Sequence, residues 1–265
     1  MKSQRAVQSI EVGGQLLLAL ARHPAPMALK DLAAEAGLSA SRAHPYLVSF
    51  GRLGLIEQDP ASGRYALGPA AFQVGLACLV QSDPMKAATP VAEALAARTG
   101  HAVAIAVWGN FGPTVVRMID GREPLHVSMR AGTVMSVAGT ATGRAFAAVL
   151  PAKTLEQAMR GSFGELRGAA PDAAAKAAAE CEQGARDWRA HGLTRAAGRP
   201  IPGVNAFSAP VLGHDGEVAL TITALGPRDV FPTGWDSAPA QAVRAAAAEI
   251  SRRLGYRGEH RAPSQ

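Results

Sequence analysis

The chain has 265 residues, 48% of them hydrophobic, and a formal net charge of +6 at pH 7. That length accommodates one large or two ordinary domains, and the apolar content is enough for a core, which excludes a disordered chain. The two cysteines, Cys78 and Cys181, lack CxxC or Cys/His spacing, so we expect neither a disulfide framework nor a zinc site. No run approaches the ~18 apolar residues of a membrane span, so we expect a cytoplasmic protein with no membrane partner.

The first 67 residues carry a pattern typical of a helix-turn-helix. Val7, Ile10, Gly14 and Leu17 recur at helical spacing and predict an N-terminal core helix. In the stretch LKDLAAEAGLSASRAHPYLVSF, the small Ala33 allows close approach of two helices, and Gly37 suits the position just after a helix end. The chain turns sharply at this glycine, and either Ser39 or Ser41 can cap the helix that follows.

The helix after this turn has one apolar face and one polar face. A helical wheel places Ala43, Leu47 and Phe50 on the buried stripe. The opposite side and its shoulders would face the major groove of DNA. The candidate contact residues there are Ser39, Ser41, Arg42, His44, Pro45, Ser49 and Arg52.

Pro45 interrupts the hydrogen-bond pattern that a regular helix would have at this position. It offers no N–H, and its ring collides with the carbonyl four residues earlier. We therefore expect residues 39–44 to form a loose or separately turned segment. The regular helix should run from about Arg42 or His44 to Leu53.

The stretch LGLIEQDPASGRYALG predicts a strand, a turn at Asp59–Gly63 and a second strand from Arg64 to Leu67. A β-hairpin directly after a recognition helix is a wing. Arg64, just past its tip, is placed to reach a phosphate or a narrow minor groove, although a solvated turn charge is the simpler interpretation. The pattern by itself favours winged-helix DNA binding over a small helical protein-interaction module.

The remainder of the chain alternates helical and β-rich segments. The expected helices are Pro84–Arg98 with a kink at Pro90, Ala141–Leu150, Thr154–Arg160, Pro171–His191 and Ser237–Leu254. The expected strands span residues 102–108, 114–120, 125–129, 205–211 and 217–225, with long loops at 131–140 and 195–204. Helices packed on an antiparallel sheet make an α+β sensor-like domain. Motifs of the GxGxxG, Walker, GxSxG and HExxH types are missing from the sequence, so we expect no enzyme, no cofactor and no metal.

From about residue 5 to residue 254 the sequence resembles the IclR family of bacterial transcriptional regulators. The resemblance is carried by the stretches LAAEAGLSASRAHPYLVSFGRLGLIEQD, SGRYALGPAAFQVG, AGTVMSVAGTATGRAFAAVLP and GVNAFSAPVLGHDGEVALTITALG. It implies an α+β chain with a winged helix-turn-helix over residues 1–67, a linker helix over 68–83, a GAF-like effector-binding domain over 84–255 and a polar tail over 256–265. It also implies homodimers or homotetramers, with dimer contacts largely in the N-terminal half.

The same resemblance indicates where an effector would bind. The residues carried over are Met135, the backbone of Ala141 and Thr142 at a helix start, Ala196, Ala206, Thr223 and Leu225. Family members that bind small keto acids have polar side chains at three of these positions, where this chain has Ala196, Ala206 and Leu225. We therefore expect a carboxylate with a larger apolar or aromatic body, bound by the helix N–H groups, Thr223 and either Asn205 or Arg195.

Two positions have a simpler interpretation. Thr223 and Asn205 can merely satisfy hydrogen bonds within their strands. His101 stands where the family usually has an acidic residue, and we expect it to be structural.

These observations together predict a DNA-binding transcriptional regulator of a metabolic or catabolic operon. It would bind a near-palindromic operator as a dimer and respond to a small organic effector. The alternative is a metabolite-binding protein or an enzyme that uses its helix-turn-helix only for docking to another protein.

Overall fold

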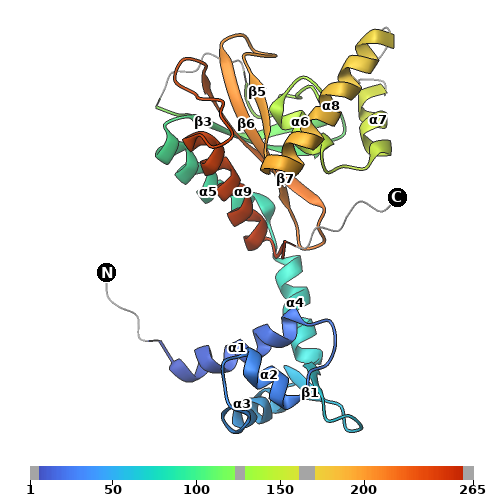
Figure 1. The fold of residues 1–265 in the computed structure, drawn as a ribbon, viewed down its shortest axis with the longest axis vertical. Helices are drawn as coiled ribbons and strands as arrows, with labels where there is room; N and C mark the ends of the chain where they lie inside the picture. The colour runs from blue at the N-terminus through green and yellow to red at the C-terminus, as the bar shows by residue number, and fades with distance from the viewer. Residues whose placement is uncertain (1–5, 123–128, 161–170, 259–265) are drawn as a thin grey trace. The chain divides into compact units, whose positions relative to one another are not determined.

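The computed structural model describes residues 6–122, 129–160 and 171–258. The chain divides into two compact units, Met1–Ser82 and Asp83–Gln265 (Figure 1). The elements of the first unit are α1 (Gln8–Arg22), α2 (Leu29–Glu35), α3 (Ala40–Arg52), β1 (Ile56–Gln58), β2 (Tyr65–Leu67) and α4 (Pro69–Val80).

The three helices α1 to α3 surround a small apolar core. Leu16 and Leu20 of α1 pack there with Leu32 of α2 and with Ala43 and Leu47 of α3. The helix α1 was correctly expected, but its buried stripe was not, because Val7 and Ile10 are exposed. Spacing identifies a helix and several possible apolar stripes, and tertiary packing selects one of them.

The turn between α2 and α3 is a Schellman motif. Gly37 has a φ of +69°, which costs a glycine little because it has no Cβ. Its N–H donates to the carbonyl of Ala34 at 3.1 Å, and the N–H of Leu38 donates to Ala33 at 2.8 Å. These bonds satisfy carbonyls at the end of α2 that would otherwise lack helical partners. The expectation for Gly37 is confirmed.

The expectation for Pro45 is wrong, because α3 runs without a break from Ala40 to Arg52 with Pro45 inside it. Ser39 occupies the N-cap position, and its carbonyl accepts from Arg42 and Ala43, both at 3.0 Å. Only the bond from residue 45 to the carbonyl of Ser41 is lost. Since Ser41 is exposed, water can solvate that carbonyl, and the helix does not need to open.

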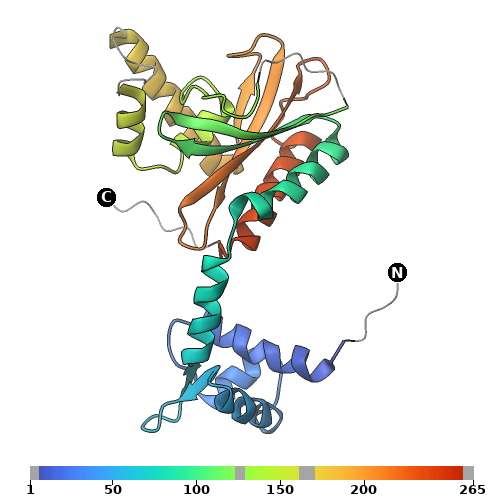
Figure 2. The same ribbon diagram turned by 180° about the vertical axis from the view of Figure 1, so that it is seen from behind.

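The second unit contains a five-stranded antiparallel sheet with the order β4-β3-β7-β6-β5. Its strands are β3 (Ala102–Gly109), β4 (Gly112–Ile119), β5 (Thr194–Ala197), β6 (Val204–Leu212) and β7 (Val218–Pro227). Its helices are α5 (Pro84–Thr99), α6 (Ala141–Ala147), α7 (Ala152–Arg160), α8 (Pro171–His191) and α9 (Ala238–Arg253). Helices α5 and α9 cover one face of the sheet (Figure 2), and α6, backed by α8, covers the other.

The two faces of this sheet differ in side-chain size. Phe207, Leu220 and Ile222 are among the large residues that point toward α5 and α9 and form the main core. Their neighbours along the strands, which point the other way, include Ala206 and Thr223. Small side chains on the α6 face therefore leave space that the opposite face does not have.

Three further expectations can be compared with the structure. Strand β5 lies in a segment expected to be a loop from residue 195, because a four-residue strand gives too short an alternation to recognise. Pro90 lies inside α5 without ending it. Residues 125–128 of the expected strand 125–129 and residues 259–265 of the expected tail lie outside the described residues.

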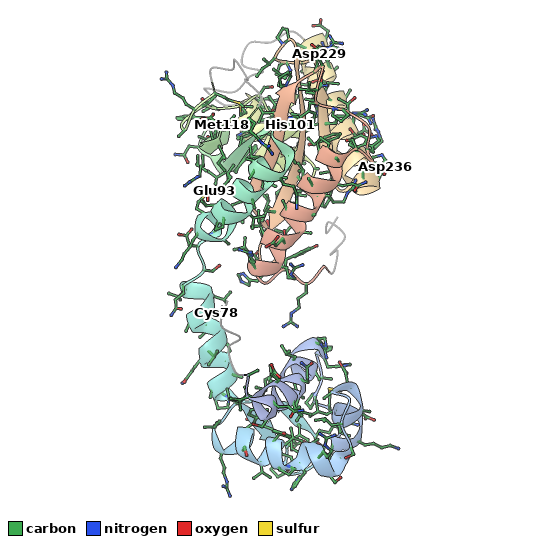
Figure 3. The ribbon with its side chains drawn as sticks, turned by 90° about the vertical axis from the view of Figure 1, so that its left-hand side faces the viewer. Cys78, Glu93, His101, Met118, Asp229 and Asp236 are labelled. Carbon is green, nitrogen blue, oxygen red and sulfur yellow. The ribbon has the colours of Figure 1, made fainter. Side chains whose placement is uncertain are left out.

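His101 directly precedes β3 and is buried in the second unit (Figure 3), with its ring centroid 4.7 Å from that of Phe231. Figure 3 also shows Glu93 on α5, which forms an ion pair with Arg117 of β4 at 2.8 Å. In the described part of the chain, no helix has both the length and the apolar character needed to cross a membrane.

The missing bond at Pro45 leads to a testable difference in local stability. We expect Pro45→Ala to protect the amides of α3 from hydrogen exchange, because it restores a donor for the Ser41 carbonyl and removes the ring clash. The gain in opening free energy should reach at most about 3 kcal/mol. Pro69→Ala is the matched control, since Pro69 is the first residue of α4, where no donor is needed. Hydrogen-exchange mass spectrometry of the full chain measures both variants. Unchanged or faster exchange of α3 in Pro45→Ala would show that the proline fits this helix without cost.

Candidate functional site

One face of α3 gathers the polar residues expected to contact DNA. All eight candidates are exposed, while Ala43 and Leu47 on the opposite side are buried in the core of the first unit. Six of them lie on α3, namely Ser41, Arg42, His44, Pro45, Ser49 and Arg52, whereas Ser39 is its N-cap residue and Arg64 directly precedes β2 in the wing. A cationic, solvent-facing helix surface of this kind has the chemistry needed to contact phosphates and base edges.

The three serine hydroxyls among these residues already have protein partners. The Oγ atoms of Ser39 and Ser41 lie 3.2 Å apart, and Ser49 Oγ donates to the carbonyl of Pro45 at 2.9 Å. The serine hydroxyls are thus oriented along the helix surface. Ser39 occupies the expected N-cap position, but its side chain makes no capping hydrogen bond to the helix.

The β-hairpin after α3 has a turn organised by Asp59. Its carboxylate accepts from the N–H of Ala61 at 3.0 Å and from the hydroxyl of Ser62. The Ser62 hydroxyl and the Ala61 N–H lower the pKa of Asp59, because both bonds favour the ionised carboxylate. Arg64 does not extend freely from the tip. Its Nη1 donates to the carbonyl of Pro26 at 3.1 Å, which fastens the wing to the loop before α2.

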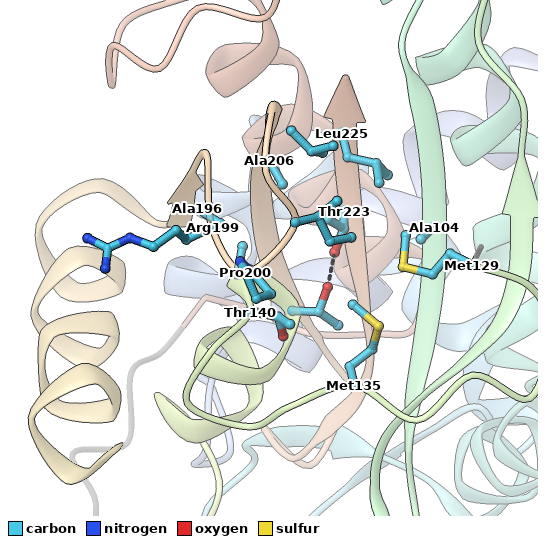
Figure 4. Close-up of a pocket in the computed structure, with 14 residues that line it drawn as sticks. Ala104, Met129, Met135, Thr140, Ala196, Arg199, Pro200, Ala206, Thr223 and Leu225 are labelled. Carbon is cyan, nitrogen blue, oxygen red and sulfur yellow. Dashed lines mark hydrogen bonds between the residues drawn. The ribbon is translucent and has the colours of Figure 1, made fainter. Parts of the chain in front are cut away.

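A second candidate site is a cavity between the small-residue face of the sheet and the N-terminal end of α6. It has an empty volume of about 420 Å³, part of it open to solvent (Figure 4). Its lining residues are Ala104, Met129, Met135, Thr140, Ala141, Thr142, Ala196, Arg199, Pro200, Ile201, Val204, Ala206, Thr223 and Leu225. Seven of the eight residues expected to form an effector site are in this set, and Asn205 is the exception.

Two rows of residues that run across the sheet, one apolar and one hydroxyl-bearing, form the sheet side of this cavity. Ala196, Ala206 and Leu225 are neighbours in register and form an apolar floor. In the adjacent row, Thr223 Oγ1 donates to Ser208 Oγ at 2.8 Å and lies 2.9 Å from Thr142 Oγ1, as the dashed line in Figure 4 marks. Thr194 Oγ1 donates to the carbonyl of Ala141 at 2.7 Å. The hydroxyl row therefore fastens the start of α6 to the sheet.

The loop before α6 is held just as closely. Thr140 caps the helix by accepting from the N–H of Gly143 at 2.9 Å, and it donates to the carbonyl of Ser136 at 2.7 Å. A Cβ at Gly143 would lie 2.1 Å from the carbonyl oxygen of Ser136, so only glycine allows this approach. The wall of the cavity at α6 is thus fixed by backbone packing.

Arg144 supports this wall from behind. Its Nη1 donates to the carbonyl of Ala138 at 2.7 Å, and its Nη2 donates to the carbonyl of Arg195 on β5. Burial lowers the pKa of Arg144, and the negative charges of Glu180 and Asp187 act in the opposite direction. Arg144 thus joins the loop, the sheet and α8.

The two polar side chains suggested as further ligand contacts point elsewhere. Asn205 donates through Nδ2 to the carbonyl of Phe231 at 2.8 Å and accepts from the N–H of Gly198 at 2.9 Å. Arg195 donates to the carbonyl of Thr233 at 2.8 Å and lies over the ring of Trp235. For Asn205, the simpler interpretation, a structural hydrogen-bonding role, fits this geometry.

Seven lining residues were not expected from the sequence. They are Ala104, Met129, Thr140, Arg199, Pro200, Ile201 and Val204. Ala104 could have been found, because it pairs with Thr223 across β3 and β7 and shares its face. The others come from loops or loop ends, whose approach to the sheet is not encoded in strand alternation. In the part of the chain that the structure describes, no group of three His, Cys, Asp or Glu side chains could hold a metal ion.

Two family models together match most of the chain. The model of the IclR helix-turn-helix domain matches residues 9–60, and the model described as bacterial transcriptional regulator IclR C-terminal matches residues 76–252. The glycerol operon regulatory protein of Streptomyces griseus is 30% identical over 259 residues, covering 95% of this chain and 98% of that protein.

Two crystal structures extend this similarity to the fold. That of Pseudomonas aeruginosa HmgR superposes with a TM-score of 0.84 at 36% identity, covering 95% of this chain and all of that one. The Agrobacterium tumefaciens repressor BlcR, at 19% identity and a TM-score of 0.77 over 96% of this chain and all of its own, shares the fold. The chain therefore belongs to the IclR family of bacterial transcriptional regulators.

Proposed function

We propose that this regulator binds a near-palindromic operator as a homodimer or homotetramer, and that a small organic acid changes its affinity for that DNA. The proposal rests mainly on helix α3, which has an exposed polar face and a buried apolar face and which precedes the wing in the chain. Two copies would present two such helices to half-sites ~34 Å apart, or a multiple of that spacing. Binding to DNA in the cell would place the protein in the cytoplasm, and we propose no catalytic activity of its own.

Self-association is supported by α4, a helix of apolar composition with no buried residue. Phe72, Leu76 and Leu79 are exposed and fall within about 60° of one another on a helical wheel. Contiguous exposed apolar surface of this kind usually marks a protein interface. We propose that this α4 stripe pairs with the same stripe of a second copy.

The cavity supports an effector with an apolar body. Its floor is formed by Ala196, Ala206 and Leu225, and Met129 and Met135 lie at its side (Figure 4). Burying a hydrocarbon or aromatic surface against such a lining favours binding, whereas a small polar keto acid would bury little apolar surface there. The proposed effector class is therefore an aromatic or long aliphatic acid.

Arg42 tests the proposed DNA face. We expect Arg42→Ala to weaken binding to the DNA upstream of the protein's own gene by about 1–3 kcal/mol, because an arginine that reads a base edge contributes about that much discrimination. Binding to scrambled DNA of the same length should fall much less. Fluorescence anisotropy at several salt concentrations measures both, with Arg98→Ala on α5 as the control. Equal losses on both DNAs would make Arg42 a phosphate contact instead of a base contact.

The α4 stripe can be tested independently of DNA. Replacing Phe72 and Leu76 together by Glu should convert the oligomer to monomer, because paired copies would bury like charges in an apolar contact. Size-exclusion chromatography with light scattering gives the mass. Phe111→Glu is the matched control, since Phe111 is an exposed aromatic residue in the turn between β3 and β4. Persistence of the oligomer in the double variant would locate the interface elsewhere.

The effector class is tested by neighbouring alanines on β5. Ala196 is buried and lines the cavity, whereas Ala197 is exposed, so the two point to opposite sides of the strand. We expect aromatic acids to raise the melting temperature of the wild type and of Ala197→Leu. Ala196→Leu should lose this stabilisation because its side chain fills the floor. Thermal-shift measurements with aromatic acids, glyoxylate and pyruvate decide the matter. Stabilisation by glyoxylate or pyruvate alone would contradict the proposed class.

A further inference from the structure

We infer that Arg199, on the loop Gly198–Gly203, supplies the positive charge that binds the acid group of the effector. The inference rests on the proposed function, because it assigns a charge partner to the proposed organic acid. Arg199, Pro200 and Ile201 of this loop all line the cavity, so the loop forms one of its sides.

The threonine hydroxyls that line the cavity have no proton left for an anion. Thr140 donates to the carbonyl of Ser136, and Thr223 donates to Ser208. Since the proton of Thr223 is used, the 2.9 Å contact between Thr142 and Thr223 requires Thr142 to be the donor. A carboxylate accepts hydrogen bonds and cannot donate them, so these three hydroxyls cannot bind it without breaking their own bonds.

The charge of an acid must therefore be compensated by another group. Among the described residues that line the cavity, Arg199 alone carries a formal charge. Two other arginines of the second unit lie behind the cavity wall and donate to backbone carbonyls: Arg144 to Ala138 and Arg195 to Thr233. The amides of Ala141 and Thr142 at the start of α6 can donate to an oxygen atom of the acid, but they carry no formal charge and α6 has only seven residues, so the full positive charge would come from Arg199.

The loop that carries Arg199 is fixed at both ends and exposed between them. Asn205 Oδ1 accepts from the N–H of Gly198 at 2.9 Å, and the carbonyl of Gly203 accepts from the N–H of Arg228 at 2.8 Å. Gly198 and Gly203 have φ values of +65° and +77°. The sequence between them, RPIP, contains two prolines, which restrict the backbone. Asn205 is thus a positioning residue for the loop, which explains why a buried amide next to the cavity floor faces away from it.

The arginine side chain itself has room to move. Arg199 is exposed, and its guanidinium extends away from Thr223 and Ala206 (Figure 4). We expect rotation about its own side-chain bonds to bring the guanidinium over the cavity opening, where two parallel N–H groups would pair with a carboxylate. The acid group would then sit at the opening, and the apolar body of the effector would lie on the alanine floor.

The test compares an acid with its neutral amide in the full-length protein. The probes are phenylacetate and phenylacetamide, and binding is measured by isothermal titration calorimetry. Arg199→Gln should weaken phenylacetate binding on the order of 10- to 100-fold, the range of a hydrogen bond to a charged group, and change phenylacetamide binding by less than about twofold. Arg199→Lys should restore part of the loss. Arg228→Gln, which removes an exposed arginine beside the same loop, should bind both probes as the wild type does.

Each other result overturns the inference in a recognisable way. Equal binding of phenylacetate to the wild type and Arg199→Gln would show that the charge is not used and would leave the proposed effector class intact. Loss of both probes, unrepaired by Arg199→Lys, would show that Arg199 shapes the loop instead. A wild type that binds neither probe would overturn the inference together with the effector class. Operator binding in the same samples would report separately on the DNA-binding function.

Discussion

The sheet of the second unit separates large side chains from small ones, and the cavity exists because of that separation. Along β6 and β7, alternate residues such as Phe207 and Ile222 fill the space under α5 and α9. The residues between them, such as Ala206 and Thr223, are too short to fill the space under α6. If both faces carried large side chains, the sheet would bury more apolar area and leave no cavity, so the buried apolar area is concentrated on one face and the cavity lies on the other.

Much of this arrangement follows from sequence patterns that have a direct physical cause. The turn at Gly37 and the buried pair Ala43 and Leu47 were predictable, because the positive φ and the helical period each leave a distinct signature. The same holds for Thr223 and Leu225, which lie two apart on one strand face. Asn205 could have been assigned correctly, since it is adjacent to Ala206 and must point to the opposite side of β6.

Other features required the folded chain. Pro45 lies within a regular helix, and Ser41, whose carbonyl it leaves without a donor, is an exposed residue; that exposure is a tertiary property. The sequence pattern places Arg64 on the wing, but it cannot predict the hydrogen bond from Arg64 to Pro26, because the two residues are 38 positions apart in the chain. Arg199 belongs to a loop with no periodicity, and only the return of β6 along β5 brings that loop over the cavity.

The hydroxyl row formed by Thr142, Thr223 and Ser208 also limits which polar groups could find a hydrogen-bond partner inside the cavity. A hydroxyl of a metabolite that reached this row could donate to a lone pair of Thr142, but it could receive no hydrogen bond from Thr142 or Thr223, because their protons already lie between two protein oxygens. A polar group that only accepts hydrogen bonds, such as a keto oxygen, must instead break a buried hydrogen bond or stay unpaired beside this row, and either outcome costs about 1–3 kcal/mol. The row would therefore disfavour acceptor-only groups at the interior of the cavity through hydrogen bonding alone, without any steric barrier at its opening.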